Sequence, residues 1–332
     1  MIALSIILPA YNNPKELALL LESIQGHCPD ISNHEVIVVD DASDGRSIEL
    51  VCKKFLFTEY IRCAKNMGVA NARNEGARAS RNDILVFIDT DLIMQTDFVT
   101  VLCEKFKDPD ILAVSGTSSD IPANPTPFRE YWGLYKAFNM PKGAYTSLFT
   151  GQQGAIRKDI FWKAGGWDAN IRGVSKEEYE FTARLEKSGV KINYEEKFEL
   201  KPHYKGFWKL VPENYRRTKK WCVIFLYRQK FDDYTSTFSG GMSYVLGALV
   251  IGSAVIALFI PEFAVILILA LLLYLAITFK FWVFIARRKG LLFTLLSVFF
   301  HLASSIFIFS GAVHGLSYCC LGENLKRKAI NS

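Results

Sequence analysis

Hydrophobic residues are concentrated in the last quarter of the chain. From residue 242 onward about two-thirds of the positions are hydrophobic, against 50% for the whole 332-residue sequence. Two apolar runs, at about 243–260 and 263–285, are separated by Pro261-Glu262. Because a helix of roughly 20 apolar residues spans the ~30 Å hydrocarbon core of a bilayer, we expect these runs to form a transmembrane hairpin.

A third apolar run, at about 291–318, leaves two alternatives open. It contains several serines and histidines, so it can either cross the membrane or lie at its surface. A crossing would leave Lys326-Arg327-Lys328 outside, against the rule that basic segments stay in the cytoplasm, whereas an interfacial course would keep them inside. We favour a third span, so the expected anchor has two to three helices.

Charge follows the same division. The net charge is +6, and the apolar segment contributes +5 of it, which leaves +1 for residues 1–241. Arg287-Arg288-Lys289 directly follows the second run, which makes residues 1–241 cytoplasmic by the same rule. In a prokaryote the membrane would be the inner one. A near-neutral first part excludes a basic nucleic-acid-binding domain, and we expect no nucleic-acid partner.

The first half of the chain alternates short strands with helices. Leu4–Leu8 and Glu35–Val39 are apolar, β-branched runs, which are typical of parallel strands buried on both faces. Asn13 and Pro14 are suited to begin a helix as N-cap and first residue. The remaining patterns predict strands at Tyr60–Cys63, Ile84–Ile88 and Ile111–Ser115 and helices at Pro14–Gln25, Val69–Ala79 and Phe98–Phe106. This order favours an open, mostly parallel α/β sheet.

Polar residues follow three of these strands at the point where each ends. The segments are Pro9–Asn12, Asp40–Ser43 and Asp89–Asp91. In open α/β sheets, ligands bind beyond the carboxyl ends of the strands, so we expect a site there. Neither G-x-G-x-x-G nor G-x-x-x-x-G-K-[ST] follows the first strand, which disfavours a dinucleotide-binding dehydrogenase and a P-loop NTPase.

Asp89-Thr90-Asp91 places two carboxylates one residue apart at a strand end. Carboxylate oxygens suit a hard cation such as Mg²⁺ or Mn²⁺, which can also bridge to substrate phosphates. A cation in that position neutralises the charge that develops on a departing nucleoside diphosphate. The pattern therefore predicts a divalent metal site beside a phosphate-containing substrate.

These residues resemble glycosyltransferase family 2, which has the GT-A fold. The likeness covers roughly residues 3–205, in the family's order along the chain. Its elements are Leu8-Pro9-Ala10-Tyr11-Asn12, Val38-Val39-Asp40-Asp41-Ala42-Ser43, Asn66-x-Gly68, Ala72-Arg73-Asn74-x-Gly76, Asp89-Thr90-Asp91, Gly165-Gly166-Trp167-Asp168 and Glu177-Glu178-x-Glu180-Phe181-x-x-Arg184-Leu185. We expect an α/β GT-A domain at 1–205, amphipathic interfacial helices at 206–241 and a transmembrane region at 242–332.

The resemblance also implies roles for residues on the donor side. Pro9, Tyr11 and Asp41 would hold the base and ribose of the nucleotide. Arg73 would lie near the ribose and the diphosphate, and Asp89 would contact the donor. These roles come from matching motif positions in the family, and they make a nucleotide-sugar the expected donor.

The metal and acceptor sides follow from the same resemblance. Asp91 would bind the metal, and His203 lies where many relatives place a further ligand. Relatives usually show Glu-Asp at the head of the acceptor-side helix, so in this sequence Glu178 would be the catalytic base. The further residues expected on the acceptor side are Asp168, Glu177 and Trp221.

The segment before the apolar runs mixes basic and aromatic residues, which favours a helix at the membrane interface. Within it, Arg217-Thr218-Lys219-Lys220-Trp221 resembles the Q-x-x-R-W motif of processive relatives such as cellulose and chitin synthases. Two key positions differ, Gln to Arg217 and Arg to Lys220. The sequence therefore does not support processive polymerisation.

Together these features predict a membrane-bound inverting glycosyltransferase of the hexosyl or N-acetylhexosaminyl type. It would move a sugar from a nucleotide-sugar, UDP- ahead of GDP-, to a lipid-linked or membrane-associated acceptor. Two alternatives stay open: a polyprenyl-phosphate glycosyltransferase and a non-catalytic membrane scaffold that binds nucleotide. A nucleotidyltransferase is disfavoured because a Gly-rich basic loop does not follow the first strand.

Overall fold

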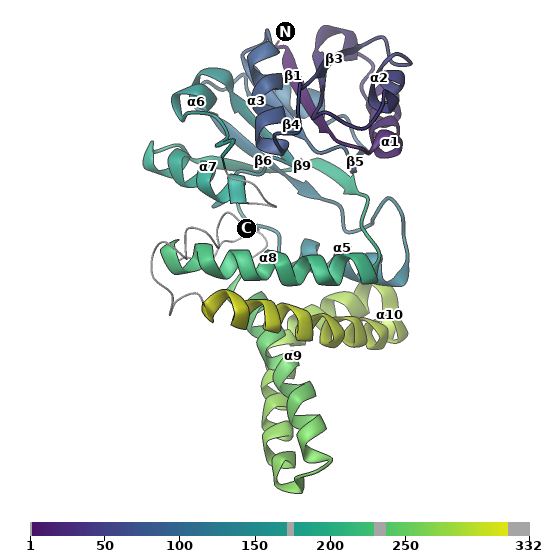
Figure 1. Cartoon of the computed structure of the whole chain (residues 1–332), viewed down its shortest axis with the longest axis vertical. Helices are drawn as coiled ribbons and strands as arrows, with labels where there is room; N and C mark the ends of the chain where they lie inside the picture. The colour runs from purple at the N-terminus through teal and green to yellow at the C-terminus, as the bar shows by residue number, and fades with distance from the viewer. Residues whose placement is uncertain (1, 171–175, 229–236, 318–332) are drawn as a thin grey trace. The chain divides into compact units, whose positions relative to one another are not determined.

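A computed structural model describes residues 2–170, 176–228 and 237–317 of the chain (Figure 1). The chain divides into two compact units. Unit 1 consists of Met1–Ala123 and Pro141–Tyr204, and unit 2 consists of Asn124–Met140 and Lys205–Ser332. The segment 124–140 thus clusters with the C-terminal helices rather than with the sheet, a feature that the sequence pattern does not indicate.

Unit 1 contains a mixed, mostly parallel sheet of nine strands within its described residues. The order across the sheet is β3-β2-β1-β4-β8-β6-β9-β5, and β7 pairs with β9. Strands β1 to β4 are parallel, and β8 runs antiparallel to β4. The strands are β1 (Leu4–Ala10), β2 (Glu35–Asp40), β3 (Thr58–Arg62), β4 (Ile84–Ile88), β5 (Leu92–Met94), β6 (Ala113–Ser118), β7 (Tyr145–Thr146), β8 (Gln153–Arg157) and β9 (Ile192–Pro202).

Helices cover both faces of this sheet (Figure 1). Ile6 packs into the core beneath α1, α2 and α4, whereas its neighbour Ile7 packs into the core beneath α3, α6 and α7. Successive residues of β1 therefore enter opposite cores, which confirms the expectation of strands buried on both faces. The helices of unit 1 are α1 (Pro14–His27), α2 (Ser47–Cys52), α3 (Val69–Ala79), α4 (Phe98–Lys105), α6 (Lys158–Lys163) and α7 (Lys176–Lys187), with a 3-10 turn η1 (Ile31–Asn33).

The sequence pattern locates these elements well, with one local difference. Strand β4 and helix α3 have the predicted bounds, and the other predicted elements shift by a few residues at their ends. Asn13 occupies the N-cap position of α1, but its side chain makes no cap hydrogen bond. Its carboxamide accepts instead from the backbone N–H of Tyr11 at 3.0 Å. The carboxamide of Asn13, which could otherwise cap α1, therefore stabilises the turn that follows β1.

Unit 2 is helical in its described residues. Helix α9 and the first half of α10 form a hairpin through a 3-10 turn, and both helices are long and apolar enough to cross a membrane. Gly290 interrupts α10 with φ 81° and ψ 174°, so the residues before and after it are separate helical segments. The elements are α5 (Pro127–Phe138), α8 (Phe207–Arg228), α9 (Phe238–Ala257), η2 (Pro261–Phe263) and α10 (Ala264–Ser317).

The core of unit 2 is built around a buried histidine. The ring of His301 stacks on that of Tyr244, with centroids 4.5 Å apart, and its Nδ1 lies 2.9 Å from the hydroxyl of Tyr131. Tyr274 and Trp282 from the first half of α10 pack around the same ring. Helices α5, α9 and both halves of α10 therefore meet at one aromatic cluster.

Candidate active site

The loops that follow β1 and β2 are joined by hydrogen bonds at the carboxyl edge of the sheet. The N–H of Asn12 donates to Ser43 Oγ at 2.9 Å, and Asn12 Oδ1 accepts from the N–H of Asp44 at 2.8 Å. Asn13 Nδ2 extends this network by donating to Thr90 Oγ1, in the loop that follows β4. The three polar segments predicted from the sequence thus form one bonded edge, because parallel strands end there together.

Asp41 lies at this edge with its carboxylate turned onto a neighbouring loop. Its two oxygens accept the N–H groups of Met67 at 2.9 Å and Gly68 at 2.8 Å. Gly68 has φ +93°, a conformation open chiefly to glycine, and it is the N-cap residue of α3. Asp41 therefore holds the turn that positions α3. Tyr11 lies on the same edge, follows Pro9 and Ala10, and is 49% exposed, so its ring is free to meet a ligand.

Asp40 was not among the residues expected to be functional, yet it organises the same loop. Its carboxylate accepts from the hydroxyl of Tyr60 at 2.8 Å, from Arg62 Nη1 at 2.9 Å and from the N–H of Ser43 at 2.8 Å. The sequence signal was its side-by-side position with Asp41. Burial makes such a charge costly unless it is paired, and here three donors satisfy it.

Arg73 is the centre of the site. It is 1% exposed, and its guanidinium donates to Asp89 Oδ1 at 2.7 Å and to Glu177 Oε1 at 3.1 Å. Its charge also lies over the ring of Trp167, 5.2 Å from the centroid. A Cβ at position 151 would lie 2.4 Å from this guanidinium, so a larger residue there would displace Arg73 from its partners. Arg73 thus joins the Asp89 motif to the head of α7.

Glu178 lies beside Glu177 at that head, and it is buried. Its Oε1 accepts the backbone N–H of Gly151 at 2.7 Å. Burial, reinforced by the neighbouring charge of Glu177, raises the pKa of Glu178 to about 7. Burial also raises the pKa of Glu177, although Arg73 opposes that effect. A carboxyl with a pKa near neutrality is suited to exchange protons at physiological pH.

Asp91 and His203 lie next to each other across two strands. Strand β5 pairs antiparallel with β9, and the N–H of His203 donates to the carbonyl of Asp91 at 2.7 Å. In the residues that the structure describes, clusters of three or more His, Cys, Asp or Glu side chains suited to a metal are absent. Mg²⁺ and Mn²⁺ sites commonly use one or two carboxylates with water and substrate phosphates, and the carboxylate of Asp91 is a donor group of that kind.

The remaining predicted acceptor residues are placed differently. Asp168 is half-buried in a turn, where its Oδ1 accepts the N–H of Asn170 at 2.9 Å. Trp167 is a core residue, and its backbone is held by two hydrogen bonds to the side chain of Asn74. Trp221 belongs to α8 of unit 2, where it stacks on Phe225. Asn74 is a positioning residue that the Asn-x-Gly spacing alone could not identify.

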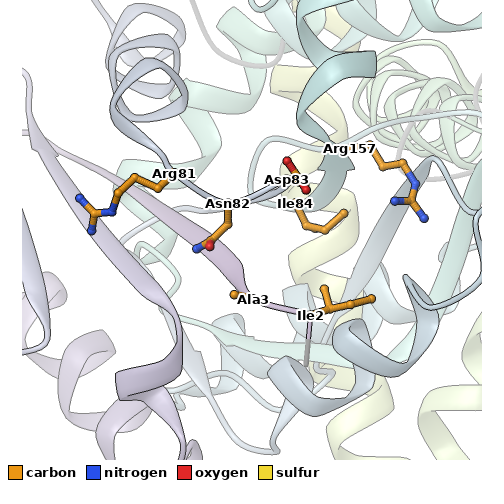
Figure 2. Close-up of a pocket in the computed structure, with 7 residues that line it drawn as sticks. All are labelled: Ile2, Ala3, Arg81, Asn82, Asp83, Ile84 and Arg157. Atoms are coloured by element: carbon orange, nitrogen blue, oxygen red, sulfur yellow. The ribbon is translucent and has the colours of Figure 1, made fainter.

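A pocket of about 360 Å³ lies at the opposite edge of the sheet, beside the amino ends of β1 and β4 (Figure 2). Its two arginines are already engaged. Arg81 forms ion pairs with Glu35 at 2.6 Å and Glu59 at 3.3 Å, and Arg157 donates to backbone carbonyls, including that of Phe106. Because the ligand edge of such sheets is the carboxyl edge, this pocket is not the candidate site.

Residues 5–165 match the model of the family described as "Glycosyl transferase family 2". Residues 5–165 form a glycosyltransferase family 2 domain. The matched segment contains the Asp41, Arg73 and Asp89-Thr90-Asp91 motifs, and it ends just before the Gly166-Trp167 turn. The fold is the mixed, mostly parallel α/β arrangement of the GT-A type, followed by long apolar helices.

Among curated proteins, an uncharacterized glycosyltransferase of Haemophilus influenzae is 34% identical over 194 residues, which are 55% of this chain and 61% of that protein. An N-acetylglucosaminyltransferase of Bradyrhizobium diazoefficiens is 34% identical over 119 residues, 34% of this chain and 24% of that protein. The poly-beta-1,6-N-acetyl-D-glucosamine synthase of Staphylococcus aureus is 27% identical over 54% of this chain and 43% of its own. The chain therefore spans less than two thirds of each of these relatives.

Among solved structures, the mannosyltransferase of Pyrobaculum calidifontis in complex with GDP-Man and Mn²⁺ has a TM-score of 0.57 and 16% identity to this chain. The match covers 94% of this chain and 86% of that one. At this identity the likeness concerns the fold. Its coverage includes the C-terminal helices as well as the sheet.

Proposed function

We propose that the chain is a membrane-anchored, metal-dependent, inverting glycosyltransferase that uses a nucleotide-sugar donor. The observation that carries the proposal is the pair of hydrogen bonds by which Arg73 joins Asp89 to Glu177. These bonds join two parts of the family 2 domain into one cluster. One part is the Asp89-Thr90-Asp91 motif, which is suited to a metal and a diphosphate, and the other is the buried carboxylate pair of Glu177 and Glu178. Diphosphate chemistry and proton removal can therefore take place side by side.

The donor would bind along the carboxyl edge of the sheet. We assign the base and ribose to Pro9, Tyr11 and Asp41. The exposed ring of Tyr11 can stack on a base, and the carboxylate of Asp41 keeps free lone pairs beside the two N–H groups that it accepts. We favour a UDP-sugar of the hexose or N-acetylhexosamine type, because two of the curated relatives are named for N-acetylglucosamine transfer or polymer synthesis.

Asp91 and His203 would hold Mg²⁺ or Mn²⁺. A divalent cation there would neutralise charge on the departing diphosphate. Mn²⁺ is also the ion in the structure of the mannosyltransferase of Pyrobaculum calidifontis. Asp89 is held by Arg73 rather than left free, so its role is to orient the donor beside the ion.

Glu178 would act as the general base. It takes a proton from an acceptor hydroxyl, whose oxygen forms a bond to the anomeric carbon of the sugar on the face opposite the nucleotide. The bond from that carbon to the diphosphate breaks at the same time, and the nucleoside diphosphate leaves with the electron pair. Because the pKa of Glu178 is raised to about 7, its ionised fraction grows through neutrality, and the rate is expected to rise with pH and level off above it.

The acceptor would be lipid-linked or held at a membrane. Helix α9 and the first half of α10 expose large apolar side chains along the hairpin, including Leu258, Phe259 and Leu272. Soluble proteins do not usually expose such a continuous apolar surface, so a bilayer would surround the hairpin. An enzyme anchored in this way meets substrates that are themselves confined to the membrane.

The test is a nucleotide-release assay with the purified full chain in nanodiscs. UDP- and GDP-sugars are supplied in turn with Mn²⁺ and a membrane lipid extract. We expect release of one nucleotide that depends on Mn²⁺ and on the extract, and that falls strongly in Asp91→Asn. Asp108→Asn, an exposed carboxylate after α4, is the matched control. Equal release by the wild type and Asp91→Asn would overturn the metal assignment, and nucleotide binding without any release would favour the scaffold.

A further inference from the structure

The second half of α10, residues 291–317, has its polar and apolar faces reversed relative to a helix in water. Its buried positions are small or polar: Thr294, Ser297, His301, Ser304, Ser305, Gly311 and Gly315. Its exposed face carries a row of large apolar side chains: Leu291, Leu292, Leu295, Leu296, Phe299, Ile306, Phe307, Phe309, Val313 and Leu316. A surface helix of a soluble protein turns its apolar stripe inward, so the solvent on the outward face is not water.

The buried face of this segment is already occupied by α8. The sequence Gly311-Ala312-Val313-His314-Gly315 has the small-x-x-x-small spacing that lets two helix backbones approach closely. A Cβ at Gly311 would lie 2.5 Å from the carbonyl oxygen of Tyr215, and one at Gly315 would collide with the carbonyl of Lys219. Helix α8 therefore lies directly on residues 311–315, and Figure 1 shows the two helices side by side. The apolar row is exposed, so α8 does not cover it.

The segment also crosses the hairpin instead of extending it. His301 packs on Tyr244 of α9 and on Tyr274 of α10, and Gly247 of α9 faces Ser305. Beyond these positions, the tip of the hairpin between Val255 and Leu273 exposes most of its apolar side chains. A third span packed alongside the first two would cover that tip, and Figure 1 shows residues 291–317 running across the hairpin beside α8.

Positive charge gathers where this segment begins. Arg287, Arg288 and Lys289 are exposed immediately before the break at Gly290. On α8, Lys209 and Arg216 are also exposed. Basic residues near an anionic leaflet are attracted to its negative surface potential. The cations before Gly290 and on α8 would lie among the charged headgroups of one leaflet. The apolar row of residues 291–317 would lie among the acyl chains of the same leaflet.

We propose that residues 291–317 form an in-plane membrane helix whose apolar row inserts into one phospholipid leaflet and does not cross the bilayer. The chain then leaves this helix on the side of the membrane from which α9 enters. This differs from the third span that the sequence favoured. The inference rests on the proposed membrane anchoring and is independent of glycosyl transfer.

The course of the chain is tested with reporters fused after Ser332 of the full chain. In bacterial cells, green fluorescent protein fluoresces in the cytoplasm, whereas alkaline phosphatase is active only outside it. The same two reporters fused before Met1 mark the side of the catalytic unit. We expect both fusion sites to report the same side. Opposite sides would show that the segment crosses, and would overturn the proposal whether or not the enzyme is active.

The occupant of the apolar row is tested by photocrosslinking in proteoliposomes of phosphatidylglycerol and phosphatidylethanolamine. The photoreactive residue p-benzoylphenylalanine replaces Phe299, which is 63% exposed, or its neighbour Phe300, which packs on Phe128 with centroids 5.3 Å apart. We expect phospholipid adducts at position 299 at several times the yield at position 300, where crosslinks should be internal. Dimeric crosslinks at position 299, or equal lipid yields at both positions, would overturn the proposal.

Recovery in the soluble fraction would refute the membrane anchoring and this inference together. Nucleotide release does not depend on where residues 291–317 lie, so a failure of the glycosyltransferase proposal would leave both experiments unaffected.

Discussion

Unit 1 and residues 291–317 of unit 2 bury opposite kinds of side chain. Unit 1 fills both faces of its sheet with aliphatic and aromatic residues. Among its described residues, charge is buried only at the cluster of Arg73 with Glu177 and Glu178 and in the loops at the strand ends. In unit 2, residues 291–317 bury serine, threonine, histidine and glycine and expose leucine and phenylalanine. The first pattern is that of a protein in water, and the second is that of helices in lipid.

The two units also differ in the kind of polar side chain that they bury. In unit 1 the buried charges are costly, and they persist because they are paired or hydrogen-bonded within a site. In the described part of unit 2 the buried polar side chains are serine, threonine, asparagine and histidine. Many of them bond to the preceding turn of their own helix, as Ser305 does to the carbonyl of His301 at 2.8 Å. Unit 1 therefore buries charge in paired groups, whereas the small polar residues of unit 2 serve close helix packing.

The largest stability effect is expected from Arg73→Met. Loss of the guanidinium leaves Asp89 and Glu177 as uncompensated carboxylates in the same cluster. Breaking a buried pair by removing one partner typically costs about 3–5 kcal/mol. Urea unfolding followed by tryptophan fluorescence measures the change. Arg78→Met on the same helix removes an exposed pair with Glu75 and should cost less than about 1 kcal/mol; equal costs for the two variants would contradict the buried cluster.

A pH-dependent effect is expected from Glu178→Gln. The pKa of Glu178 is raised in the folded state to about 7, so the folded protein holds a proton that the unfolded chain releases at about pH 4. Wild-type stability contributed by this group therefore falls as pH rises from about 4 through 7, at about 1.4 kcal/mol per pKa unit. Glutamine lacks this penalty. The gain in Tm of the variant over the wild type should grow between pH 5 and pH 8; a gap independent of pH would contradict the raised pKa.

A smaller effect is expected in unit 2 from Gly311→Leu. The new side chain meets the backbone of α8 at Tyr215, and overpacking of this kind typically costs about 1–3 kcal/mol. Gly252→Ala on α9 is the control, because a Cβ there meets nothing within 4 Å, and it should be neutral or stabilising. Thermal unfolding in detergent compares the two. A tolerated Gly311→Leu would show that α8 does not lie on that face.

Much of the fold was predictable from local pattern. Strand β4 and helix α3 were found at their true bounds because a run buried on both faces and a helical spacing are properties of adjacent residues. The strand-end site followed from topology in the same way. Segment 124–140 was missed, because its membership in unit 2 depends on packing with helices that begin at Phe207 and beyond.

The contacts around Arg73 also could not be predicted from the spacing of residues along the sequence. Its partners Asp89 and Glu177 lie 16 and 104 residues away in the sequence, and family resemblance pointed the same arginine toward the diphosphate. Glu177 and Glu178 were found as an acidic helix start, but their burial, and with it the raised pKa of Glu178, is a tertiary property. The in-plane course proposed for residues 291–317 also depends on tertiary structure, because the sequence does not show which side chains of this helix are buried and which are exposed.

In the proposed mechanism, Glu178 removes the proton from the acceptor hydroxyl. The most direct measurement is the rate of sugar transfer by wild type and Glu178→Gln, with the same donor and acceptor, at pH 8 in nanodiscs. Glu186→Gln, an exposed glutamate on the same helix, is the matched control. We predict that Glu178→Gln falls by roughly 100-fold or more while the control keeps its rate. A wild-type rate for Glu178→Gln would contradict the claim and point to an acceptor phosphate that is already ionised.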